Sequence, residues 1–291
     1  MANEIALFKK YINAADLIYQ RESISAVLDG APELVREGAN ADELVIPKIA
    51  MDGMADYSRN DGYVSGSVSV TFETIKCNYD RGRMFQIDVL DDQETMGIAF
   101  GKLLSEFIRT KSIPEVDAFR FAAYAQMEGI STTTAAALGT GAAVQLALRA
   151  ATDQMDNDEV TGSKYLFIVS PLINSMKDLD TTKSRAVLEK FDGIFEVPQK
   201  RFYTQIDLLD GKGENSAGGY IRHTGANNIN FLIVEKSAII QFTKHGEEKI
   251  VTPEANNDAN AWKLGYRRVG IAEVYENKVA GIYLHKSTVT S

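Results

Sequence analysis

The sequence of 291 residues has little of what several common classes of protein need. Its single cysteine, Cys77, excludes an internal disulfide and fits a reducing compartment. No segment approaches the roughly 18 consecutive apolar residues of a membrane-spanning helix. The first residues show no basic segment followed by an apolar one, so we expect no signal peptide. The three histidines have no partner at metal-ligand spacing, which argues against a metal site.

The charge and composition narrow the class further. There are 31 Lys and Arg residues against 40 Asp and Glu residues, a formal net charge of −9 at pH 7. An acidic chain is a poor candidate for a dedicated nucleic-acid binder or a protein that docks on anionic membranes. With 45% hydrophobic residues, the composition is typical of a globular protein with a substantial core.

Motifs for catalysis are weak or missing. No Gly-x-Ser-x-Gly nucleophile motif occurs. Gly139-Thr140-Gly141 opens an expected helix, but a dinucleotide fingerprint needs a preceding strand, and the preceding residues are rich in Thr and Ala. Gly211-Lys212-Gly213 is not followed by the Gly-Lys-Ser/Thr of a P-loop. We therefore predict no catalytic residue, no cofactor and no bound metal.

The N-terminal third has an extended pattern. An amphipathic helix is expected over residues 5–19, and a strand over 44–51, which Pro47 places at a sheet edge. A polar, Gly-rich loop tip follows over 52–66. Alternating apolar residues come next at Val68, Val70 and Phe72 and then, on the opposite parity, at Ile75, Cys77 and Tyr79. This shift predicts a β-bulge or a change of packing face.

Asp80-Arg81-Gly82-Arg83 reads as a turn before a return strand. Together the two strands predict a long two-stranded arm, which is marginal alone in water and so requires a partner surface. The clearest helix is expected over 92–127, after a capping pattern at Asp91–Glu94. Pro114 should kink or restart this helix, with Ser112 and Glu115 as a second capping pair.

The remainder mixes helices and strands without an internal repeat. A linker is expected over 131–137. Helices are expected near 144–155, 172–176 and 184–190, and strands near 165–169, 195–208 and 230–242. A hairpin over 269–275 and 279–284 is expected to close the chain. The pattern thus combines a mixed body with arms that cannot bury their own surfaces, which is what a subunit of a larger assembly needs.

The sequence also resembles the major capsid proteins of tailed bacteriophages. The similar segments run in order along nearly the whole chain, from Val45–Ile49 and Asp56–Asn60 through Thr71–Thr74, Asp80–Arg83, Pro114–Phe121, Val197–Gln199 and Arg201–Thr204 to Tyr275–Lys278 and Gly281–Tyr283. Each segment is short, and their order and spacing carry the resemblance.

The resemblance implies an α+β chain with the Hong-Kong-97-like capsid fold. Its parts would be an N-arm at residues 1–43, an extended hairpin called the E-loop at 44–80, a peripheral domain at 81–129 and 256–291 with a spine helix at 92–127, and an axial domain at 130–255. The inter-subunit contacts would involve the E-loop tip, at Tyr57, Arg59, Asp61 and Tyr63. Arg81 and Arg83 would serve an inter-subunit contact or a structural turn.

The implied function is self-assembly into the icosahedral shell of a virion, built in the host cytoplasm around double-stranded DNA. The implied partners are many copies of the chain in hexamers and pentamers, a separate scaffolding protein and a portal, with no membrane and no specific DNA binding. The loops near Gly211–Gly219 are candidates for contacts around the symmetry axes. Two alternatives stay open: an encapsulin-like cargo shell, and an α/β nucleotide-binding enzyme that uses Gly139–Gly141.

Overall fold

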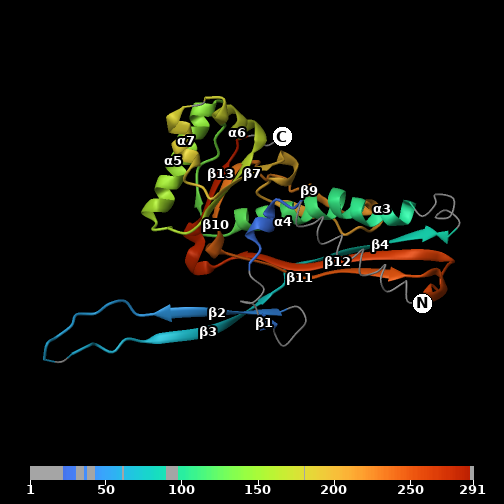
Figure 1. Cartoon of the computed structure of the whole chain (residues 1–291), viewed down its shortest axis with the longest axis horizontal. Helices are drawn as coiled ribbons and strands as arrows, with labels where there is room; N and C mark the ends of the chain where they lie inside the picture. The colour runs from blue at the N-terminus through green and yellow to red at the C-terminus, as the bar shows by residue number, and fades with distance from the viewer. Residues whose placement is uncertain are drawn as a thin grey trace.

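The computed structural model describes residues 22–30, 36–37, 43–60, 62–89, 98–179 and 181–288. Figure 1 shows three parts, which we call the α/β half (α5 to α7 with the sheet beneath them), the helix–sheet half (α3 and α4 over β4, β11 and β12) and the projecting hairpin (β2 and β3). The helix expected over 5–19 and the capping residues Asp91–Glu94 lie outside the described residues.

The α/β half contains a five-stranded sheet covered by helices on one face and by the end of the long helix on the other. The strand order is β5 (Ser131–Thr132), β13 (Ile282–Lys286), β10 (Ile229–Glu235), β6 (Lys164–Val169) and β7 (Gly193–Val197). Helices α5 (Gly141–Asn157), α6 (Ser170–Lys177) and α7 (Thr182–Leu188) cover the first face. The elements expected here from hydrophobic periodicity are confirmed, with ends shifted by a few residues.

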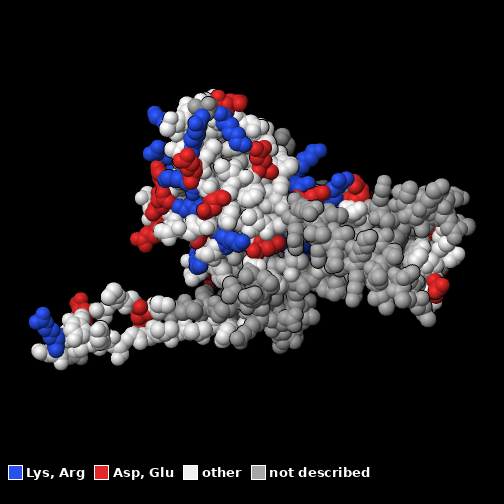
Figure 2. Space-filling model, in the orientation of Figure 1, with Lys and Arg blue, Asp and Glu red and all other residues white. Residues whose placement is uncertain are grey.

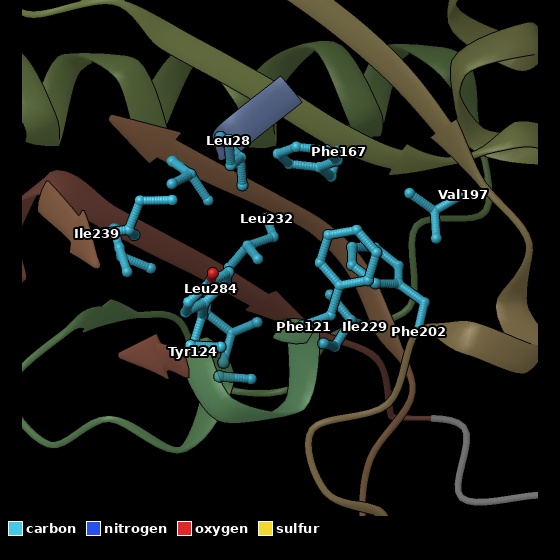
Figure 3. Packing of buried hydrophobic residues seen from close by; sticks show 14 of the residues in the cluster. Leu28, Phe121, Tyr124, Phe167, Val197, Phe202, Ile229, Leu232, Ile239 and Leu284 are labelled. Carbon is cyan, nitrogen blue, oxygen red and sulfur yellow. The ribbon is translucent and has the colours of Figure 1, made fainter. Parts of the chain in front are cut away.

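Strand β6 explains why its sequence is a continuous apolar run. Leu166 and Ile168 pack with α5, α6 and α7, whereas Phe167 and Val169 face the opposite cluster. A strand buried on both faces needs apolar residues at every position. Figure 3 shows the second cluster, in which Phe121 of the long helix packs on Phe167 with 5.1 Å between ring centroids.

The helix–sheet half places a long helix across an antiparallel sheet of β11 (Ile239–Val251), β12 (Ala261–Val274) and β4 (Tyr79–Asp88). The helix consists of α3 (Ile98–Phe107), a π-helical turn at Ile108–Ser112 and α4 (Ile113–Gln126). It is roughly 43 Å long at about 1.5 Å per residue. Its first part packs on the three-stranded sheet and its last part on the five-stranded sheet, so it connects both halves.

The helix does not restart at Pro114. Proline lacks an amide hydrogen and disfavours the preceding α-helical hydrogen bond, and the π-helical turn that ends at Ser112 accommodates this without breaking the helix. Ser112 keeps helical dihedral angles, φ −66° and ψ −48°, and makes no capping hydrogen bond. The expected second capping pair is therefore wrong.

Two further expectations fail because strand partners are distant in sequence. The terminal hairpin does not form: β12 belongs to the three-stranded sheet and β13 to the five-stranded sheet. The segment 195–208 is divided among β7, a 3-10 turn and β8 (Ile206–Leu208), which pairs with β9 (Tyr220–Arg222).

The other described 3-10 turns are Ser25–Leu28, Gly213–Asn215, Lys236–Ala238, Pro253–Ala255 and Glu276–Gly281. In the described part of the chain, no helix has the length and apolarity needed to cross a membrane.

Candidate assembly surfaces

The projecting hairpin is formed by β2 (Glu43–Met51) and β3 (Val68–Lys76), with the short β1 (Arg36–Glu37) beside β2. Its ladder runs without interruption from the pair Glu43–Lys76 to the pair Met51–Val68. Of the two predicted alternatives, the unbroken ladder excludes the β-bulge, and the change of packing face is confirmed. Val68, Val70 and Phe72 are exposed, whereas Ile75 and Cys77 pack beside buried residues of β11 and β12.

The exposed part of the hairpin carries an unusual amount of apolar surface. Val68 is 70% exposed, Val70 54% and Phe72 59%. Met51, Met54 and Val64 are also exposed near the far end. A contiguous apolar surface on a projecting arm is typical of a protein–protein contact, because leaving such a surface exposed to water is unfavourable. Figure 1 shows this arm extending away from both halves of the body.

Three of the four tip residues predicted from the sequence, Tyr57, Arg59 and Tyr63, lie at the far end of the hairpin. Tyr57 and Tyr63 are exposed, and their ring centroids are 4.8 Å apart. A bridge between Ser58 and Gly62 closes the turn around the exposed Arg59. Gly62 has φ +78°, which an L side chain rarely adopts. Asp61 lies outside the described residues.

Arg81 and Arg83 are not in a turn. They lie inside β4, paired with Arg268 and Tyr266 of β12, and they point to the helix-covered face together with Tyr79. The turn prediction was wrong because Gly82 is needed for close strand packing and not for a turn. A Cβ on Gly82 would lie 2.9 Å from the carbonyl oxygen of Tyr266.

Both arginines hold the loop between β8 and β9. The Arg81 Nε donates to Glu115 Oε1 at 2.8 Å, and its Nη2 donates to the Gly219 carbonyl at 3.2 Å. Arg83 donates to the Ser216 carbonyl at 2.8 Å. The loop of residues 211–219, expected at a symmetry axis, is thus attached to β4 of its own chain. Burial and the neighbouring Glu115 carboxylate raise the pKa of Tyr79 well above its usual value.

The segment of residues 22–30 crosses the long helix and is held there by buried polar groups. We call this arrangement the N-terminal clamp, formed by Asp117 and Arg120 of α4 and Gln241 of β11 with this segment. The fully buried Asp117 accepts from the Ser23 hydroxyl at 2.7 Å and from the Ser25 hydroxyl at 2.6 Å.

Further bonds complete the clamp. The Ile24 and Ser25 amides donate to Asp117 at 3.2 Å, and Arg201 pairs with it at 3.3 Å. Arg120 pairs with Asp29 at 3.0 Å, and the Gln241 amide donates to the Ser25 carbonyl at 2.7 Å. Leu28 is inserted into the cluster shown in Figure 3. No local pattern predicts this clamp, because its N-terminal segment is 94 residues from Asp117 at Ser23 and 216 residues from Gln241 at Ser25.

The α/β half carries charged side chains of both signs, several of them in ion pairs. Asp156 pairs with Lys190 at 3.0 Å and with Lys164, and these ammonium groups lower the pKa of the carboxyl. On the face of the α/β half that Figure 2 shows, blue and red side chains of the described residues are interspersed without a patch of one sign. Such a surface gives a polyanion no continuous basic track to follow.

The described residues give little support to an enzyme. They contain no group of three or more His, Cys, Asp or Glu side chains that is arranged to hold a metal. Gly141 is explained by packing, since a Cβ there would lie 2.0 Å from the Ser175 carbonyl oxygen of α6. Thr140 caps α5 by accepting from the Ala143 amide. Gly141 and Thr140 thus have structural reasons, whereas a Cβ on Gly139 would meet no atom within 4 Å.

Comparison with known proteins gives similarity in structure only. No known sequence family and no curated sequence matches the chain. A virus-like particle from Pyrococcus furiosus matches with a TM-score of 0.58 and 9% identity over 96% of this chain and 99% of that one. The capsid of Staphylococcus phage Andhra gives 0.54 and 11% over 89% and 84%. The capsid of cyanophage P-SCSP1u gives 0.52 and 11% over 88% and 86%. The fold expectation is therefore confirmed: this α+β chain has the Hong-Kong-97-like fold of phage capsid subunits.

Proposed function

We propose that this protein is the major capsid protein of a tailed bacteriophage, and that it assembles into an icosahedral shell around double-stranded DNA. The observation that carries the proposal is the projecting hairpin, whose Val68, Val70 and Phe72 stay exposed in a single copy of the described chain. The capsid fold, shared with virion structures from several phages, gives this arm its context.

The assembly mechanism follows from the arm. Burial of an exposed Val or Phe side chain contributes about 1.5–3 kcal/mol, so the apolar stripe of one hairpin on a neighbouring copy supplies a modest contact. A closed shell repeats this contact at every subunit, and many modest contacts then sum to high stability. The tip residues Tyr57, Arg59, Asp61 and Tyr63 are proposed to contact that neighbour.

The parts of the subunit are assigned by analogy with the fold. We assign the E-loop to 44–80 and the spine helix to the helix that ends at Gln126. The five-stranded sheet with α5, α6 and α7 is proposed as the axial domain, and the sheet of β4, β11 and β12 as the peripheral domain. On this assignment β13 belongs to the axial domain and β11 to the peripheral domain, which revises the boundaries drawn from the sequence.

The wall of such a shell must enclose DNA without holding it tightly. The net charge of −9 and the interspersed surface charges suit that role. We propose further that the subunits meet in hexamers and pentamers, with a scaffolding protein and a portal as other partners, and that the shell forms in the host cytoplasm. The chain is proposed to act without a catalytic residue.

One observation keeps a second candidate within the same fold, without supporting it better than the first. The virus-like particle from Pyrococcus furiosus aligns over 96% of this chain and 99% of its own length. A cargo-enclosing compartment without a genome therefore stays as the alternative. It differs from the first proposal in the contents of the shell, whereas the subunit contacts would be the same.

Electron microscopy of the purified protein tests the proposal. Closed, uniform shells are expected, and a protein that stays monomeric at all concentrations would refute it. Mass spectrometry and absorbance of particles from the native source separate the candidates, because packaged DNA supports the capsid and a packaged protein supports the compartment. A nucleotide thermal-shift screen covers the enzyme alternative, for which we expect no response.

A further inference from the structure

The root of the projecting hairpin contains an asparagine whose position is not explained by core packing. Asn78 lies between the end of β3 at Lys76 and the start of β4 at Tyr79. Its side-chain amide donates to the Ala272 carbonyl at 2.9 Å. The Ala272 amide donates back to the Asn78 Oδ1 at 3.1 Å. Asn78 itself is an exposed residue, so it fills no cavity.

These two bonds replace the next step of the sheet. The ladder between β4 and β12 ends at the pair Tyr79–Gly270. In a continued antiparallel ladder, residue 77 would lie opposite Ala272. The Asn78 side chain presents one donor and one acceptor in a plane, as a peptide group does. It therefore satisfies Ala272 while the main chain turns away from the sheet.

Among the hairpin residues whose side chains the structure describes, Met51, Val68, Val70 and Phe72 are exposed. The contacts of β3 and its root with the body, among these described residues, are those of Ile75 and Cys77 with the pair Ile240 and Ile271. The hairpin ladder is unbroken from Glu43–Lys76 to Met51–Val68, so we treat the hairpin as one arm. Its direction is consequently set at the root.

We propose that Asn78 is the positioning residue that fixes the angle at which the hairpin leaves the body. This inference rests on the proposed function, in which the hairpin must reach a neighbouring copy. The nine-residue strand β3 is about 30 Å long at about 3.3 Å per residue, so a rotation of about 10° at the root moves its far end by roughly 5 Å. That shift exceeds the contact range of apolar side chains, about 4.0–4.5 Å.

The test uses three variants of the full chain. Asn78→Ala removes both hydrogen bonds, and Asn78→Asp keeps the size but places an oxygen against the Ala272 carbonyl. Asn215→Ala is the matched control, because Asn215 is also exposed but lies in the loop between β8 and β9. Fluorophores attached through non-canonical amino acids at positions 59 and 149 report the distance from the hairpin tip to α5 and leave Cys77 in place.

Both Asn78 variants are expected to broaden the distance distribution by several ångströms and to lower the yield of closed shells at least several-fold. Melting of the body should stay as in the Asn215→Ala control. A distribution as narrow as that of the wild type would overturn the proposal, as would a lowered melting temperature with an unchanged hairpin angle. If the wild type forms no shells, the proposed function fails, but the distance measurement still tests Asn78.

Discussion

The N-terminal clamp gives the sharpest prediction for the body of the subunit. The perturbation is Asp117→Ala, which removes a fully buried carboxylate that accepts from the Ile24 and Ser25 amides and pairs with Arg201. The two serine hydroxyls can turn toward each other, since their oxygens are 3.4 Å apart. The two backbone amides lose their acceptor, and the Arg201 guanidinium, whose side chain is 22% exposed, loses its fully buried partner.

The magnitude follows from those orphaned donors. A buried donor without an acceptor costs about 1–3 kcal/mol, and breaking a buried charge pair by removing one partner costs about 3–5 kcal/mol. We expect the attachment of residues 22–30 to weaken by about 3 kcal/mol. Because about 1.4 kcal/mol corresponds to a factor of ten, amide exchange in this segment should accelerate by about 100-fold.

Hydrogen-exchange mass spectrometry of the peptide covering residues 22–30 measures this effect, with all variants in the same assembly state. Asp117→Asn keeps the side-chain volume and should also accelerate exchange, because its NH2 group would face the backbone amides of Ile24 and Ser25, which are donors themselves. Asp153→Ala is the control, since the ion pairs of Asp153 with Lys190 and Arg149 are exposed, and such pairs contribute about 0–1 kcal/mol. If exchange in Asp117→Ala stays within about 3-fold of the wild type, the reasoning about buried unpaired donors is refuted.

Three further predictions concern the arm, the buried histidine and the arginine contacts. Deletion of Ser58–Gly62 should leave the body folded but lower the yield and stability of shells, seen by electron microscopy and sedimentation; wild-type yield and stability would contradict the contact between neighbours. Burial lowers the pKa of His285 from its ordinary value of 6.5, so the unfolded chain takes up the proton first and stability should fall as the pH drops below about 6.5. Urea midpoints between about pH 7.5 and 5.5 measure this, and His285→Gln should flatten the profile; equal slopes in both proteins would contradict it. Arg83→Ala removes the donor to the Ser216 carbonyl and should accelerate amide exchange of residues 211–219 by a few-fold, about 0.5–1.5 kcal/mol for one hydrogen bond. Arg149→Ala, an exposed arginine on α5, should not change exchange in that loop, and an equal effect of both variants would refute the attachment.

Local sequence patterns were sufficient for elements whose partners are adjacent or whose burial is uniform. The apolar spacing of Val144, Leu148, Ala151 and Met155 predicts one buried face of α5, and these residues are buried there. The run in β6 predicts a strand covered on both sides. The two strands of the hairpin and its polar tip were also predicted, because alternation and turn residues are local properties.

The structure decided what depends on distant residues. Strand β13 joins β10 instead of its neighbour β12, because its apolar residues are buried on both faces of the five-stranded sheet. The local sequence predicts a turn at Gly82, whereas the structure shows that the close approach of Tyr266 on the neighbouring strand requires a glycine there. Nothing in the sequence distinguishes Asp117 from the other acidic residues. Its role depends on hydrogen bonds with Ser23 and Ser25, which are more than 90 residues away in the chain.

The sequence by itself determined the secondary structure of the hairpin and the α/β half, the absence of catalytic motifs and the resemblance to a capsid family. Only the tertiary structure decided which strands pair, where the N-terminal segment is held and how the hairpin is attached at Asn78. The physical reason is that periodicity reports burial along one element. A polar side chain acquires its role only from the donors and acceptors that folding places opposite it.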